Sequence, residues 1–115
     1  MTNEIQFLSW DEFRRMAPSI LQLEVTRIGE VLSKISLDIE HRNGLVRARH
    51  AMKEFIECVE KERKQTIQSS CEPLLARALV NMPPPEAVAD VETAHTIEYI
   101  VDRLQYVIHR IPLIY

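Results

Sequence analysis

The stretch from residue 21 to residue 40, LQLEVTRIGEVLSKISLDIE, decides the fold class. Its apolar residues return at alternating steps of four and three, at Leu21, Val25, Ile28, Leu32, Ile35 and Ile39. This spacing puts them on one face of an α-helix and is typical of helices that pack along a shared apolar seam. The stretch therefore predicts a long helix with one buried face.

A second helix is expected directly after the first. Asn43-Gly44 is a typical helix end, because glycine readily takes the left-handed conformation that caps a helix. The apolar 3/4 spacing then resumes, which predicts an antiparallel helical hairpin at about 19–42 and 45–64. Gly29, inside the first of these helices, is expected to mark a close crossing with a neighbouring helix.

A short helix is also expected before the hairpin, over residues 10–16. Ser9 and Glu12 have the spacing of a capping box, S-x-x-E, which favours a helix start. Pro18 follows soon afterwards, and a proline disfavours helical conformation in the residue that precedes it. We therefore expect this helix to end before Pro18.

Two more helices are expected in the second half of the chain. The segment near Ser70 predicts a short helix with Pro73 in its first turn, where proline is tolerated. The prolines at 83–85 form a stiff link, and the apolar spacing then predicts a long helix at about 86–110. The apolar tail at 111–115 is expected either to fold back on the core or to contact a neighbouring molecule.

Composition agrees with a helical fold. Glycine occurs only 2 times in 115 residues, and tight hairpins, phosphate-binding loops and dinucleotide-binding turns all need glycine. We therefore expect an all-α protein, an irregular antiparallel bundle of four to five helices without strands. Residues 1–115 are expected to form a single helical domain.

The cysteines and the apolar segments bear on location. Cys58 and Cys71 are too few for a disulfide framework and lack the spacing of a zinc site. Two reduced thiols in a cytoplasmic protein are expected, with a Cys58–Cys71 disulfide as the alternative. The first residues hold an early acid and no long apolar run, and no stretch has the length and apolarity of a membrane span. The expectation is a cytoplasmic protein without membrane contact.

One basic stretch, HRNGLVRARHAMK at 41–53, contains no acid. Residues 41–64 hold 7 basic and 4 acidic side chains, 7 − 4 = +3, in a chain whose net charge is −3. Nucleic-acid-binding domains are usually strongly basic, and no aromatic side chain interrupts this stretch to stack on bases. A nucleic-acid-binding protein that uses the 42–53 basic face is therefore an alternative that the overall charge disfavours.

The same basic stretch suits an acidic protein partner better, because the arginine guanidinium pairs well with carboxylates. The residues expected to make this contact are Arg47, Arg49, His50 and Lys53.

Two carboxylate–histidine pairs raise a metal-binding alternative. Asp38-x-x-His41 and Glu92-x-x-His95 have the i, i+3 spacing found in helical di-iron bundles, which puts both ligands on one helix face. Such a site needs further inward carboxylates from two other helices. In this sequence the pairs fall beside the apolar seams, so we expect no metal and no cofactor.

No catalytic motif stands out, since the chain has neither a glycine-flanked nucleophile nor a phosphate cradle. We expect a small non-enzymatic regulatory or adaptor protein that acts through protein–protein interaction, such as an inhibitor or antiactivator of a transcription factor or enzyme. The long apolar seams predict a homodimer. Further partner contacts are expected near the C-terminus, at Tyr106, Leu113, Ile114 and Tyr115.

Overall fold

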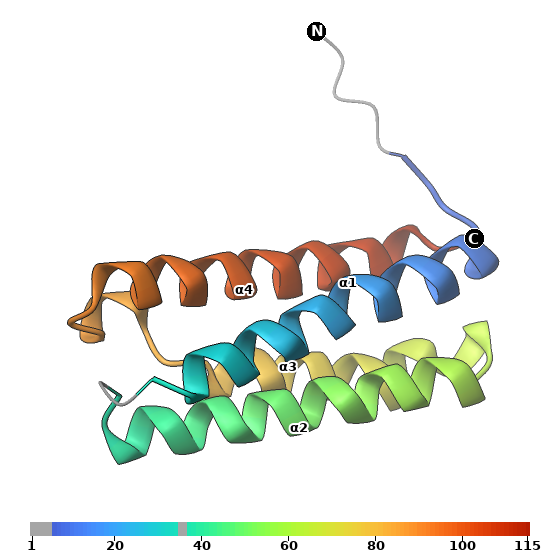
Figure 1. The fold of residues 1–115 in the computed structure, drawn as a ribbon. Coiled ribbons are helices and arrows are strands. Elements are labelled where there is room, and N and C mark those ends of the chain that lie inside the picture. The colour runs from blue at the N-terminus through green and yellow to red at the C-terminus, as the bar shows by residue number, and fades with distance from the viewer. Residues whose placement is uncertain (1–5, 35–36) are drawn as a thin grey trace, which may run out of the picture.

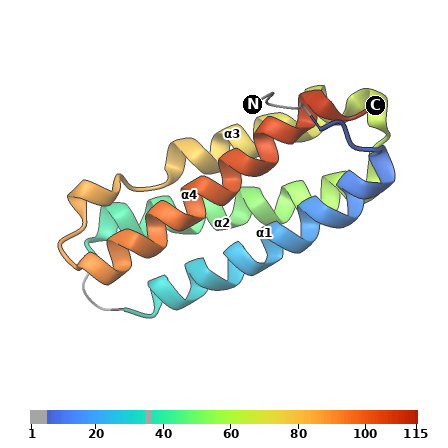
Figure 2. The same ribbon diagram turned by 90° about the horizontal axis from the view of Figure 1, so that it is seen from above.

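The computed structural model describes residues 6–34 and 37–115 of the chain. Its four α-helices are α1 (Trp10–Leu32), α2 (Ile39–Lys61), α3 (Glu72–Asn81) and α4 (Val91–Arg110). Successive helices run in opposite directions and pack against each other, and α4 also returns to pack against α1 (Figures 1 and 2). The predicted all-α antiparallel bundle is confirmed.

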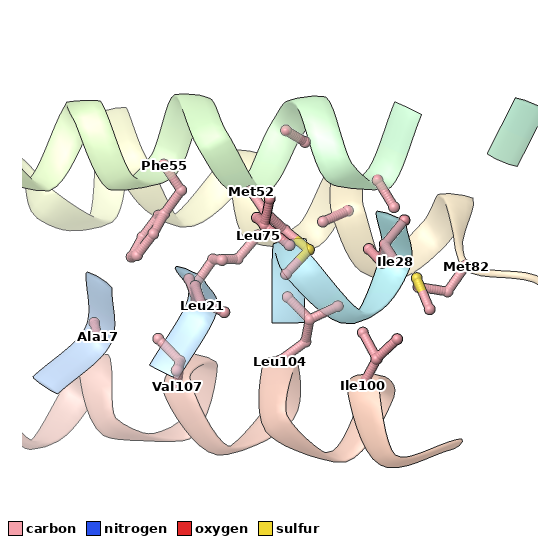
Figure 3. Close-up of a cluster of buried hydrophobic side chains, with 14 of the residues drawn as sticks. Ala17, Leu21, Ile28, Met52, Phe55, Leu75, Met82, Ile100, Leu104 and Val107 are labelled. Atoms are coloured by element: carbon pink, nitrogen blue, oxygen red, sulfur yellow. The ribbon is translucent and has the colours of Figure 1, made fainter. Parts of the chain in front are cut away.

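One apolar core fills the space between the four helices. Figure 3 shows side chains from all of them meeting there, among them Leu21, Ile28, Met52, Phe55, Leu75, Leu104 and Val107. All of these are fully shielded from solvent. Burying a side chain of this size contributes about 1.5–3 kcal/mol. The core therefore fixes the backbone that positions the surface residues described below.

Helix α1 begins where the sequence predicts but ends later. The backbone N–H of Glu12 donates to the Ser9 hydroxyl at 3.1 Å, and the Glu12 carboxylate accepts from the Ser9 N–H at 3.4 Å. The predicted end before Pro18 is wrong, because α1 continues through this proline. Pro18 removes one backbone hydrogen bond. Ala17 and Leu21 on either side of it are fully buried, so burial of the continuous apolar face offsets that loss.

The turn between α1 and α2 lies earlier than the sequence predicts. The expected helices at 19–42 and 45–64 are wrong in their shared boundary, because Asn43-Gly44 lies inside α2. Instead, Asp38 caps α2, and its carboxylate accepts a hydrogen bond from a backbone N–H of the first turn at 2.9 Å. Ile35, one position of the predicted seam, lies outside the described residues.

Neither glycine has the role expected of it. Gly44 is fully buried and does not have a positive φ, so it is not a left-handed cap. A Cβ added to Gly44 would lie 2.5 Å from the backbone oxygen of Asn81, so glycine allows α2 and α3 to approach closely here. The predicted crossing at Gly29 is wrong. A Cβ there would meet only Arg49 Nη1, at an ordinary distance of 3.7 Å.

Helix α3 starts near the predicted position, with Pro73 in its first turn. It follows a π-helical turn, η2 (Ile67–Cys71), whose last residue forms a disulfide with Cys58 near the end of α2. The Cα atoms of the two cysteines are 5.9 Å apart. The expectation of two reduced thiols is therefore wrong for this structure. The antiparallel course of α2 and α3 brings the cysteines together, and spacing along the sequence does not reveal that.

Helix α4 is shorter at its start than predicted. The expected helix at 86–110 begins only at Val91, and Pro85–Ala87 form a separate 3₁₀ turn, η3. Asp90 sets the start, because its carboxylate accepts a hydrogen bond from the Thr93 N–H at 3.1 Å. The end of α4 agrees with the prediction.

Candidate functional site

An open hollow of about 340 Å³ lies between α2 and α3, which run side by side (Figures 1 and 2). Its lining surface is almost wholly apolar, although cationic side chains contribute to it through their aliphatic stems. We call it the α2–α3 groove. It is lined by Val46, Arg47, His50 and Ala51 of α2 and by Arg77 and Asn81 of α3.

Helix geometry explains how these residues come to share one groove. The lining residues form pairs four positions apart in the sequence, and such pairs are neighbours one turn apart on a helix surface. Two pairs come from α2 and one from α3. The close approach of Gly44 to Asn81 holds the two helices together at one end of the groove. The groove is therefore built on two helices that the core and this contact keep in place.

The groove carries positive charge although the chain as a whole is acidic. Within the described ranges, neither Arg47 nor Arg77 has a carboxylate within 4.0 Å. His50 differs, because its Nε2 lies 2.6 Å from the carboxylate of Glu54. Two arginines, one from each wall, are therefore available for an acidic group, in a chain whose net charge is −3.

Of the four basic residues predicted to contact a partner, only Arg47 and His50 line the groove. Arg49 lies on the other flank of α2, beside Gly29 of α1. Lys53 is exposed but is not part of the groove lining. The structure thus divides the predicted basic surface between different sides of one helix.

The first part of the basic stretch joins α2 to the end of α1. The guanidinium of Arg42 donates hydrogen bonds to the backbone oxygens of Leu32 at 2.6 Å and Lys34 at 2.8 Å. These carbonyls lie at the C-terminal end of α1, where a positive charge is favourable. His41 lies beside Arg42 in the first turn of α2, with Nδ1 3.2 Å from the Asp38 carboxylate. Arg42 and His41 are therefore occupied by the structure.

Sequence reasoning missed four groove residues, namely Val46, Ala51, Arg77 and Asn81. Val46 is 43% exposed although it lies on a helix whose other apolar side chains are mostly buried. An apolar residue outside the 3/4 spacing is a signal that the sequence does contain. No comparable signal marks Arg77 or Asn81, because their approach to α2 depends on how α3 packs.

The predicted C-terminal contacts lie at the far end of the bundle from Gly44. The tail folds back, with the Leu8 N–H donating to the Leu113 oxygen at 3.2 Å and the Tyr115 N–H donating to the Leu8 oxygen at 3.0 Å. Leu113 and Ile114 are half-buried there. Tyr106 and Leu113 help to line a separate hollow of about 550 Å³, and Tyr115 remains exposed. Of the two outcomes expected for the tail, the structure has the first.

The two carboxylate–histidine pairs do not converge. Asp38 and His41 form the cap of α2, and Glu92 and His95 are exposed on the first turn of α4. Across residues 6–34 and 37–115, no three histidine, cysteine, aspartate or glutamate side chains gather in a way that would hold a metal ion.

One buried acid lies outside the groove, between α1 and α4. The Glu24 side chain is almost fully buried, and its burial raises the pKa of this carboxyl. Arg27 and Arg103 oppose that shift, with Arg27 Nε 2.9 Å from Glu24 Oε1. The geometry of this contact is not that of a hydrogen bond, so both atoms lack a hydrogen-bond partner among the described residues. The Arg27 guanidinium also stacks over the ring of Tyr99. Within this cluster only Glu24 is buried, and Arg27 and Tyr99 remain partly exposed.

No protein-family model, curated protein or solved structure matches the chain. In the described part of the chain, every helix is too short or too polar to cross a membrane.

Proposed function

We propose that this protein is a small non-enzymatic regulator or adaptor that acts by binding another protein through the α2–α3 groove. One observation carries the proposal. The groove is an open, apolar hollow between two packed helices, and it is bordered by two arginines that have no carboxylate within 4.0 Å among the described residues. An apolar hollow of this size can receive one anchoring side chain of a partner, and a few such buried anchors dominate binding energy at protein contact sites. Arginine is also enriched among the residues that dominate binding energy at such sites.

The finer form of the proposal is an inhibitor or antiactivator that occupies a surface of a transcription factor or enzyme. A chain of 115 residues has enough surface for one standard contact patch of about 800 Å². Binding by occupation needs no reacting group, and the groove offers shape and charge rather than a nucleophile.

Site-directed photo-cross-linking tests the proposal. A photoreactive phenylalanine analogue replaces Val46 in the groove, and in a matched variant it replaces Val80. Val80 is 84% exposed on α3 but does not line the groove. We expect one protein to be captured covalently from the native cell extract by the position-46 variant and not by the position-80 variant. Equal capture at both positions, or capture at neither, would contradict groove binding.

We also propose that the protein forms a homodimer, and this proposal does not depend on groove binding. Support comes from large apolar side chains that the fold leaves exposed, including Ile39 and Val91. Sedimentation equilibrium at micromolar concentration measures the mass directly. A mass of twice 13.4 kDa is expected, and a monomer would remove the dimer without affecting groove binding.

A further inference from the structure

We infer that the occupant of the α2–α3 groove is an acidic amphipathic helix of the partner protein. Its apolar side chains rest on Val46 and on the aliphatic stems of Arg47 and Arg77, and its carboxylates pair with the guanidinium groups of these two arginines. This inference rests on the proposed function and adds the chemistry of the partner.

The apolar floor sets the first requirement. The surface that lines the groove is almost wholly apolar, so a fully charged or hydrated ligand would lose water there without replacement contacts. An apolar side chain gains by leaving water at the same place. The occupant must therefore present apolar groups to the groove.

The arginines set the second requirement. Arg47 comes from α2 and Arg77 from α3, so cations stand on both walls of the apolar floor. Neither has a carboxylate within 4.0 Å in the described part of the chain, and the nearby His50 already has Glu54. Arginine binds carboxylates through two parallel hydrogen bonds. The occupant must therefore carry acids beside its apolar groups.

Helical form satisfies both requirements at once. The lining residues repeat one helical turn apart along both walls, and side chains on a third helix repeat with the same spacing. Such a helix packs between two other helices by placing its rows of side chains in the spaces between theirs. An apolar stripe flanked by acids then meets the apolar floor flanked by arginines.

The same residues disfavour a nucleic acid. Two arginines neutralise few phosphates, and the described lining of the groove holds no phenylalanine, tyrosine or tryptophan to stack on a base. The net charge of −3 repels a long polyanion over the rest of the surface. An acidic helix that crosses α2 and α3 at the groove needs favourable charges only there, and a crossing orientation keeps it away from Glu54, Glu57 and Glu62, which line the next hollow along α2.

Peptide binding by the full chain tests the inference. The probe is a fluorescent peptide of about four helical turns, with leucines on one face and glutamates flanking them. Its partner probe has glutamines in place of the glutamates. We expect the acidic peptide to bind at least roughly tenfold more tightly than the neutral one in fluorescence anisotropy. Equal binding of the two peptides would overturn the inference.

Charge reversal locates the site. The double substitution Arg47→Glu with Arg77→Glu is expected to weaken binding of the acidic peptide by roughly tenfold or more, and a peptide with lysines instead is expected to bind this variant. Lys53→Glu is the matched control, because it reverses a charge on the exposed side of α2 outside the groove. Circular dichroism checks that all three chains are folded. An equal loss in Lys53→Glu, or tighter arginine-dependent binding of a DNA oligonucleotide, would count against an acidic helix.

The two proposals fail separately. If the acidic peptide binds no better than the neutral one while cross-linking at position 46 still captures a partner, groove binding stands and the acidic helix is wrong. If the peptide binds as expected but cross-linking at position 46 captures nothing, the chemistry of the groove is right and the cellular function is wrong.

Discussion

Replacing each glycine with alanine makes a sharp test of how α2 and α3 pack. Both Gly29 and Gly44 lie inside helices, so Gly→Ala at either position gains about 1 kcal/mol of intrinsic helix stability. The substitutions differ only in what the new methyl group meets. At Gly29 it meets the end of the flexible Arg49 side chain at 3.7 Å. At Gly44 it would lie 2.5 Å from the backbone oxygen of Asn81, so the backbone itself must move.

The magnitude follows from that difference. A carbon–oxygen contact normally lies at about 3.3 Å or more, so the end of α3 must recede by roughly 1 Å to admit the methyl group. Overpacking of this kind typically costs about 1–3 kcal/mol. The shared gain in helix propensity cancels when the two variants are compared. Gly44→Ala should therefore be less stable than Gly29→Ala by about 2 kcal/mol, and less stable than the wild type by about 1 kcal/mol.

Urea unfolding followed by far-ultraviolet circular dichroism measures these free energies, and thermal unfolding gives a second readout. For a chain of this length, 2 kcal/mol corresponds to a separation of the two variants by roughly 8 °C in melting temperature. If Gly44→Ala were as stable as Gly29→Ala, the close approach of α2 to α3 would be wrong. The position of Asn81 at the end of the groove would then be wrong as well.

Three further predictions concern other contacts. Reducing the Cys58–Cys71 disulfide should lower the free energy of unfolding by about 3 kcal/mol, as measured by urea unfolding with and without dithiothreitol; a double cysteine-to-serine variant that still responds to dithiothreitol would show that another effect is at work. Arg42→Ala should cost about 1.5–3 kcal/mol, because it removes two charge-assisted hydrogen bonds from the end of α1; a change below about 0.5 kcal/mol would refute the cap. For Glu24, burial raises the pKa in the folded state, so wild-type stability should fall as pH rises from the ordinary glutamate pKa through the raised value. Glu24→Gln should remove this fall and be more stable at neutral pH, and a variant with the wild-type pH profile would contradict the assignment.

Local signals in the sequence predicted the helices, whereas packing decided two of their boundaries. The capping box at Ser9 and Glu12 involves neighbouring residues alone, so its spacing was sufficient. Pro18 and Gly44 are helix breakers by local preference, and both lie inside helices in the structure. Burial on either side of Pro18 and the contact of Gly44 with another helix outweigh a preference of about 1–3 kcal/mol. Neither contact can be read from neighbours in the sequence.

The candidate site was predictable only in part, for a similar reason. Arg47 and His50 belong to a basic run that the sequence makes obvious, and both line the groove. Arg77 stands alone in its segment. Arg77 becomes part of the site because α3 packs antiparallel to α2. The residues next to Arg77 in the sequence do not predict this packing.

The positions of the basic residues around α2 explain how an acidic chain presents a cationic site. Consecutive residues on a helix point about 100° apart, so a run of charges cannot form one surface. In α2 the run is divided: Arg42 binds the end of α1, Arg49 lies beside α1, and Arg47 faces the groove. The charge that matters for a partner is therefore the local pair Arg47 and Arg77. Neither the excess of basic residues in the segment 41–64 nor the net charge of the chain predicts this local charge. This is also why the groove fits a few carboxylates on a helix better than the continuous charge of a nucleic acid.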